Sequence, residues 1–327
     1  MLLPLVYLQI LLELVIDNFM KQSIKIFSPA TVANISCGFD ALGLALEGKC
    51  DEIVFTKRHD DVLIITKIEG ANLPYNINDN LVGTVINAMF KKANTSFGLD
   101  IEIYKGFKPG SGLGSSAASA AGTAFAINEL LGKPFNKTEL VKFAMLGEEA
   151  ACGSQIADNV SAAIFGGFVL IRSYKPIEVV SLPVPDDLYI TALHPQIEIK
   201  TEDARNVLPK HIPLKSAITQ WSNVGGLISG LYSSDYDLIS RSLQDVIVEP
   251  VRKSLIPHFD MVKKSALDSG ALGAGISGSG PTIFALSKGI NTANNILHGM
   301  QETYKNTKIN FSVFNSKISS QSIKILD

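Results

Sequence analysis

Short stretches of alternating apolar and polar residues predict β-strands in both halves of the chain. Residues 23–28, 51–58 and 99–106 have this pattern, with many β-branched side chains. Further apolar runs of strand length lie at 62–68, 166–174, 188–195, 281–287 and 308–315. Strands are therefore expected along the whole chain and not in one part of it.

Between these runs, apolar residues recur every three or four positions, which is the spacing of a helix that buries one face. This spacing predicts helices at 80–93, 115–132, 136–150, 216–232, 256–270 and 292–306. Gly132 is suited to end the second helix, and Asn136 or Thr138 to cap the third. A proline-rich turn at 183–185 predicts a boundary between two lobes, 20–183 and 184–327, in an α+β or α/β pattern.

The first sixteen residues are apolar with one charge, Glu13. They are short for a membrane span, and they lack the basic start and small-residue cleavage site of a signal peptide. The sequence after Met20 is typical of the start of a domain. We therefore expect residues 1–19 to be an upstream extension, with Met20 as the true start. The alternative is an added helix or strand packed on the core.

Composition excludes several classes of function. The chain has 327 residues, 46% of them hydrophobic and 18% charged, which is enough for one large or two moderate cores. A net charge of −2 gives no electrostatic basis for nucleic-acid binding. Cys37, Cys50 and Cys152 are scattered, which disfavours a disulfide framework or a zinc site. We expect a cytoplasmic protein without a membrane or nucleic-acid partner.

Residues 109–122 read PGSGLGSSAASAAG and lie between a predicted strand and a predicted helix. Glycines permit positive φ and a close approach of the backbone, and the free N–H groups of a helix start attract phosphate. Ser115 and Ser116 add hydroxyls suited to a phosphate or a metal ion. The segment therefore predicts an anion site. From the residues alone, the alternative is a tight turn before a closely packed small-residue helix.

Two better-known phosphate loops do not fit this segment. A Walker A loop has a lysine after its last glycine, whereas Ser115 follows Gly114. The G-x-G-x-x-G fingerprint fails because Gly110, Gly112 and Gly114 are two residues apart. Residues 273–278 match that fingerprint, but they follow a predicted helix and lead into a strand, so we interpret the match as a false positive.

The pattern P-x-x-G-L-G-S-S-A-A, here PGSGLGSSAA, resembles the signature of the GHMP kinases. Residues 28–46 and 270–286 resemble the first and third motifs of that family. Segments 157–171, 199–209 and 248–259 are similar to homoserine kinases in particular. The resemblance runs from about residue 23 to near the end of the chain.

The resemblance implies a two-domain α+β fold, with an N-terminal domain like ribosomal protein S5 domain 2 and a ferredoxin-like C-terminal domain. It implies ATP-dependent phosphorylation of the hydroxyl of L-homoserine, a step towards threonine, in a site between the domains. A homodimer is compatible with it.

The resemblance also implies roles for individual residues. Ser116 and Glu148 match the family's Mg²⁺ ligands, with Glu149 as an alternative to Glu148. The residues implied to contact ATP are Asn80, Lys105, Pro109, Gly110, Ser111, Gly112, Leu113, Gly114, Ser115 and Ser116. Those implied to contact the substrate are Asn34, Asp40, Thr201, Arg205 and Arg252.

The chemistry of L-homoserine is consistent with this set. Asp40 suits the ammonium, Arg205 and Arg252 suit the carboxylate because a guanidinium pairs with it bidentately, and Asn34 suits the hydroxyl or amine. Thr201 is expected to cap the helix that carries Arg205, with a substrate contact as the alternative.

The chain departs from the GHMP pattern at two positions. Asn159 stands where many members have a catalytic aspartate, and homoserine kinases resemble this chain in lacking that aspartate. The resemblance therefore implies that the hydroxyl proton leaves late, towards the phosphate. We do not assign Asp158 as a base. Ile156 stands where homoserine kinases commonly have histidine, which puts one polar substrate contact in doubt. The alternatives are another GHMP kinase, for a mevalonate-like alcohol, or a non-catalytic sensor. The first leaves Asp40 unexplained, and the second conflicts with an intact phosphate loop.

Overall fold

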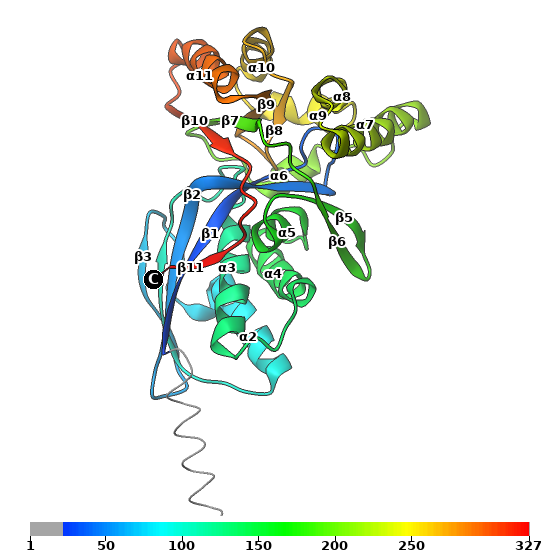
Figure 1. Ribbon diagram of the computed structural model, residues 1–327. Helices are drawn as coiled ribbons and strands as arrows, with labels where there is room; N and C mark the ends of the chain where they lie inside the picture. Colours follow the sequence, from blue (N-terminus) through cyan, green and yellow to red (C-terminus); the bar gives the residue numbers. More distant parts are fainter. Residues whose placement is uncertain (1–21, 327) are drawn as a thin grey trace, which may run out of the picture.

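The computed structural model describes residues 22–326, so the prediction for residues 1–19 lies outside it. The chain forms two sheets, each with helices packed against it (Figure 1). The α+β class is thus confirmed.

The first sheet has the strand order β11-β1-β2-β4-β3, with β5 beside β2 and β6 beside β5. Its pairs are antiparallel, except that β3 and β4 are parallel. Its strands are β1 (Ser23–Ala33), β2 (Leu42–Lys57), β3 (Leu63–Glu69), β4 (Leu99–Tyr104), β5 (Phe168–Tyr174), β6 (Ile177–Leu182) and β11 (Lys324–Leu326).

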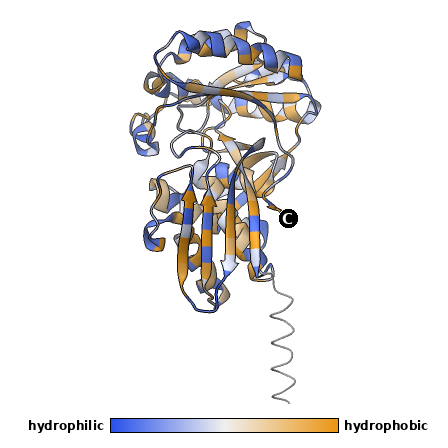
Figure 2. Cartoon of the chain, turned by 90° about the vertical axis from the view of Figure 1, so that its left-hand side faces the viewer, coloured by the Kyte–Doolittle hydropathy of each residue, from blue (hydrophilic) through white to orange (hydrophobic). Residues whose placement is uncertain are grey.

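Helices cover one face of this sheet (Figure 1). They are α2 (Leu81–Ala93), α3 (Ser115–Leu130), α4 (Lys137–Cys152) and α5 (Asp158–Phe165), with a short 3-10 turn, η1 (Ile77–Asp79), before α2. Asn136 caps α4 through a reciprocal capping box with Glu139. Of the two predicted caps, Asn136 and Thr138, the structure thus has Asn136. Hydrophobic and hydrophilic residues alternate along the strands of this sheet (Figure 2), because alternate side chains face the helices.

The second sheet has the antiparallel order β10-β7-β9-β8. Its strands are β7 (Leu188–Pro195), β8 (Gly273–Ile276), β9 (Ile283–Lys288) and β10 (Phe311–Lys317). The accompanying helices are α6 (Thr201–Asn206), α7 (Leu214–Ser233), α8 (Tyr236–Ser242), α9 (Glu249–Arg252), η2 (Lys253–Leu255), α10 (Phe259–Asp268) and α11 (Ile290–Lys305).

Every strand and helix predicted from the pattern is present, with bounds that differ by a few residues or, for β1 and β2, more. The chain passes from the first sheet to the second between Leu182 and Leu188, where the proline-rich turn lies. Its last strand, β11, then returns to pair with β1, so a single cut after residue 183 does not separate the two sheets.

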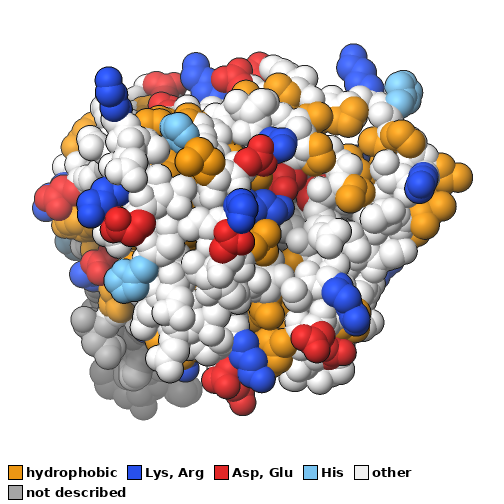
Figure 3. Space-filling model, turned by 90° about the horizontal axis from the view of Figure 1, so that it is seen from above, with side chains coloured by type: hydrophobic (Ala, Val, Ile, Leu, Met, Phe, Trp, Pro, Cys, Tyr) orange, Lys and Arg blue, Asp and Glu red, His pale blue; other side chains and the backbone are white. Residues whose placement is uncertain are grey.

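A buried cluster joins the two parts of the molecule. Leu42 and Leu44 of β2 lie in it with Phe284 and Leu286 of β9, and Leu227 of α7 packs there as well. On the face seen from above, positive and negative side chains are interspersed, without a large area of one sign (Figure 3). Within residues 22–326, no helix is long and apolar enough to cross a membrane.

Candidate active site

A cavity of about 920 Å³ is lined by residues of both parts of the chain. One wall is the glycine-rich loop before α3, and another is formed by α6 with the turn between β8 and β9. Of the fifteen residues implied to contact ATP or substrate, the cavity brings together all except Ser111 and Leu113.

The glycine-rich loop has the geometry that the sequence predicts for an anion site. Gly110, Gly112 and Gly114 have φ of 70°, 79° and 69°, which a side chain disfavours. Gly114 is the N-cap of α3 and supplies no side-chain cap, so no side chain takes the first N–H groups of the helix.

The turn between β8 and β9 supports this loop from behind. A Cβ on Gly112 would lie 2.6 Å from the Ser277 carbonyl oxygen and 2.8 Å from that of Gly280. The Ser277 hydroxyl donates to the Gly112 carbonyl. The G-x-G-x-x-G match at 273–278 is therefore a strand and a hairpin turn, which confirms that it is not a dinucleotide fingerprint.

Ser111 and Leu113 are buried and lie outside the cavity lining. The Ser111 carbonyl accepts a hydrogen bond of 2.6 Å from the Thr282 hydroxyl, and the Leu113 carbonyl accepts one of 3.0 Å from the backbone of Thr31. These two residues thus anchor the loop, whereas Pro109 and Gly110 line the cavity.

Glu148 of α4 faces the start of α3. Its side chain is buried close to the Ser116 hydroxyl, and its Oε1 has no hydrogen-bond partner. Burial raises the pKa of Glu148 to about 7. Glu149 is exposed and accepts a 2.7 Å hydrogen bond from Gln155, so of these two glutamates only Glu148 lines the cavity.

Lys105 and Asn80 line the cavity, but their polar groups have protein partners. The Lys105 ammonium is buried in an ion pair with Asp51 and donates to the Ser115 carbonyl at 2.8 Å. Burial lowers the pKa of Lys105. Asn80 caps α2 by accepting from Val82, and its amide donates to Pro74. Both residues thus brace the walls of the cavity.

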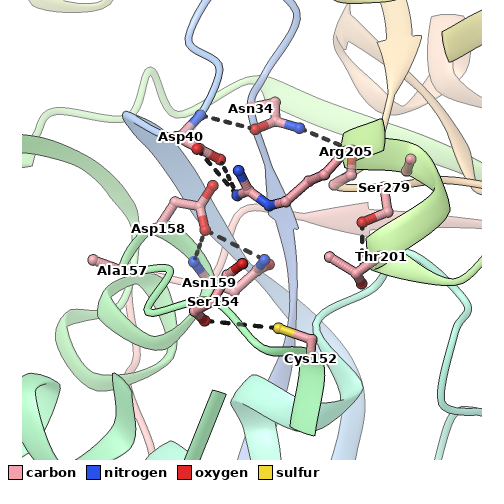
Figure 4. A network of polar contacts seen from close by, with 12 residues as sticks. Asn34, Asp40, Cys152, Ser154, Ala157, Asp158, Asn159, Thr201, Arg205 and Ser279 are labelled. Carbon is pink, nitrogen blue, oxygen red and sulfur yellow. Dashed lines mark hydrogen bonds and ion pairs between the residues drawn. The ribbon is translucent and has the colours of Figure 1, made fainter. Parts of the chain in front are cut away.

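Asp158 and Asn159 begin α5 (Figure 4), and Asn159 lies close to Gly114 of the glycine-rich loop. The Asn159 Oδ1 accepts a 2.7 Å hydrogen bond from the Thr31 hydroxyl. Asp158 is buried and accepts from the Asn159 backbone at 2.7 Å. Burial, with the negative charge of Asp40 next, raises the pKa of Asp158 to about 8. A carboxyl with this pKa is mostly protonated at neutral pH, so it is poorly suited to act as a base.

Asp40 and Arg205, two of the charged residues expected to contact the substrate, lie together (Figure 4). Arg205 pairs with both carboxylate oxygens of Asp40, at 2.9 and 3.0 Å. The Asn34 side chain accepts from the Asp40 backbone at 3.1 Å and donates to the Gly278 carbonyl at 2.9 Å. Arg252 donates to the same carbonyl at 3.1 Å and to that of Ala204 at 2.8 Å.

Thr201 corrects one expectation. The residue before α6 is Lys200, no side chain caps the helix, and Thr201 is the first helical residue, so the predicted cap at Thr201 is wrong. The Thr201 hydroxyl accepts a 3.3 Å hydrogen bond from Ser279, and Thr201 lines the cavity. Ile156 also lines the cavity.

Sequence reasoning missed two parts of the site. Asp51 holds Lys105 from β2, and the Phe39 ring lies against the guanidinium groups of Arg205 and Arg252. Their partners come from other segments of the chain, so no local pattern could have identified them. Among the described residues, no cluster of three or more histidine, cysteine, aspartate or glutamate side chains could hold a metal ion.

Comparisons with known proteins agree on one family. The model described as "GHMP kinases N terminal domain" matches residues 80–167, and "GHMP kinases C terminal" matches residues 227–306. A homoserine kinase of Chlorobium phaeobacteroides (strain BS1) is 46% identical, over 92% of this chain and 98% of its own. One from Methanococcus maripaludis (strain S2 / LL) is 42% identical, over 82% of this chain and 88% of its own.

Solved structures give the same result. The crystal structure of homoserine kinase from Cytophaga hutchinsonii has a TM-score of 0.90 and 49% identity, and it covers 94% of this chain and 98% of its own. L. major mevalonate kinase, at 16% identity and a TM-score of 0.70, shares the fold alone. The chain therefore belongs to the GHMP kinases, and its similarity within that family is to the homoserine kinases.

Proposed function

We propose that the protein transfers the terminal phosphoryl group of ATP to the side-chain hydroxyl of L-homoserine. Relatives named homoserine kinase at 42–49% identity support this. The observation that carries the proposal is the layout of the cavity, which has a glycine loop for phosphate on one wall and Asp40, Arg205 and Arg252 at the other end. An α-amino acid with a hydroxyl matches both ends.

The amino-acid end can exchange its own charges for those of a substrate. Asp40 and Arg205 neutralise each other in a half-exposed ion pair. The substrate ammonium would bind the Asp40 carboxylate, and the substrate carboxylate would bind Arg205 and Arg252. Asp40 and Arg205 would each exchange one oppositely charged partner for another, and Arg252 would gain one. Charge-assisted hydrogen bonds of this kind are about twice as strong as neutral ones.

At the phosphate end, the free N–H groups at the start of α3 would bind the phosphate oxygens. Ser116 and Glu148 fit a magnesium ion, because they offer a hydroxyl and a buried carboxylate oxygen without a partner. When bound, magnesium neutralises phosphate charge, which is a main requirement of phosphoryl transfer.

The reaction needs accurate positioning more than a strong base. Asn159 is neutral and its Oδ1 is held by Thr31, and Asp158 has a raised pKa. Within this proposal, the hydroxyl proton leaves late in the transfer, towards the phosphoryl oxygens. The hydroxyl would be oriented by the bound amino-acid end and not activated by a carboxylate.

A coupled assay of ADP release tests the proposal with a panel of acceptors: L-homoserine, L-serine, L-threonine and mevalonate. We expect L-homoserine to have the highest kcat/KM. Efficient turnover of another alcohol without turnover of L-homoserine would overturn the proposal and would identify Ile156 as a mark of changed specificity. No turnover of any alcohol would favour a sensor.

A further inference from the structure

Phe39 occupies a fixed turn at the substrate end of the cavity. Its backbone neighbours are held by hydrogen bonds from Gly38 to the Asn34 carbonyl, at 2.8 Å, and from Leu42 to the Gly38 carbonyl, at 2.8 Å. The next residue, Asp40, donates to the Asn34 side chain. The half-buried ring of Phe39 lines the cavity, so the turn presents it in one place.

Two guanidinium groups lie over this ring. The guanidinium carbon of Arg252 is 4.9 Å from the ring centre, and that of Arg205 is 5.7 Å from it. Both distances fall within the range of about 6 Å in which a cation is attracted to an aromatic face. Phe39 thus contacts both arginines that the proposed function assigns to the substrate carboxylate.

Arg252 needs such a contact more than Arg205 does. It is buried, and among the described residues it has no ion-pair partner, whereas Arg205 pairs with Asp40. Burial lowers the pKa of Arg252 to about 10; the nearby charge of Asp40 opposes this shift, and that of Arg205 adds to it. Apart from the more distant charge of Asp40, its compensation comes from two backbone carbonyls and the Phe39 ring.

The type of partner matters for binding. A protein carboxylate on Arg252 would compete with the carboxylate of the substrate for the same N–H groups. An aromatic ring stabilises the cation through its quadrupole and leaves the remaining strong donors for an anion. The ring also draws two mutually repelling cations to one place.

We propose that Phe39 is a positioning residue for substrate recognition. It holds Arg205 and Arg252 together and charged, so that both can bind the carboxylate of the amino-acid substrate. This inference rests on the proposed function, because it assigns that carboxylate to the two arginines.

The test compares Phe39→Leu with Phe39→Tyr, which keeps the ring. With L-homoserine and ATP, we expect Phe39→Leu to raise the KM for L-homoserine about tenfold, with the KM for ATP and the kcat within about twofold, because cation–ring attraction is worth about one power of ten in affinity. Phe39→Tyr should stay within about threefold of wild type in every constant. Phe314→Leu is the matched control, since Phe314 is half-buried with Lys49 over its ring and lies outside the cavity lining.

A second substrate separates positioning from general damage. The amide of L-homoserine has no carboxylate, so Phe39→Leu should lower its kcat/KM less than twofold while lowering that of L-homoserine about tenfold. Equal losses for both compounds, or no loss for L-homoserine, would overturn the inference. If Phe39→Leu does not fold, Phe39→Met serves in the same comparison. Failure of the proposed function would be seen separately, as absence of L-homoserine turnover by the wild-type protein.

Discussion

Replacing Glu148 with glutamine should make the protein more stable and much less active. The carboxyl is buried, and burial raises its pKa from 4.5 to about 7. The folded state therefore holds this proton more tightly than the unfolded state, so stability falls as the pH rises from 4.5 to 7. A shift of this size corresponds to a loss of about 3 kcal/mol of folding stability, and this loss is complete above pH 7.

Glutamine keeps the shape of the side chain and a polar group near Ser116 but removes the buried charge. We expect melting of Glu148→Gln, without nucleotide, to occur about 5 °C higher than wild type at pH 8, and within about 2 °C of wild type at pH 5. At pH 8, with ATP, magnesium and L-homoserine, kcat should fall at least about a hundredfold, because the proposed metal ligand is lost.

Thermal melts at both pH values and a magnesium titration of turnover measure these effects. Glu149→Gln is the matched control, because its side chain is exposed and bonded to Gln155, and it should behave like wild type. Wild-type turnover in folded Glu148→Gln would refute the metal assignment. If the gain in melting temperature of Glu148→Gln over wild type is no larger at pH 8 than at pH 5, the reasoning from burial is refuted.

Three further predictions concern other parts of the site. Gly112→Ala should lose about 2 kcal/mol or more of stability in a denaturant titration and most of its ATP affinity, because the new Cβ would meet two carbonyl oxygens. Gly132→Ala is the control: Gly132 has a similar φ but open space around it, so this variant should lose about 1 kcal/mol. Arg252→Lys should raise the KM for L-homoserine at least about tenfold and that for ATP less than about twofold, since an ammonium cannot replace the guanidinium fork; equal changes would mean that Arg252 acts elsewhere. Asp158→Asn should raise the melting temperature more at pH 9 than at pH 5, because burial raises the Asp158 pKa to about 8 and the ionised form destabilises the fold; a larger effect at pH 5 would contradict this.

Regular patterns in the sequence were sufficient to predict most of the elements. Alternation marked strands such as β4, where every second residue is buried, and helical spacing marked α2 and α11. Two of the elements that were not predicted, β8 and β11, have little local signal. β8 is the tetrapeptide Gly273–Ile276, and β11 has three residues that are held by β1 from the other end of the chain.

The geometry of the glycine-rich loop could be predicted because its residues are contiguous and its glycines adopt positive φ. The substrate end could be named only through a family resemblance, because Asp40, Arg205 and Arg252 come from distant segments. The side-chain partners of the site residues could not be predicted from the sequence, because they too come from distant segments. Lys105 was expected near the nucleotide, yet its ammonium is bound by Asp51.

The central claim is that the phosphoryl group is transferred to the hydroxyl of L-homoserine. Proton-coupled ³¹P NMR of the wild-type protein with ATP, magnesium and L-homoserine tests it directly. The account predicts a new phosphomonoester resonance, split into a triplet by the two protons of the side-chain methylene next to the phosphorylated oxygen. Formation of inorganic phosphate and ADP alone, without that triplet, would contradict it.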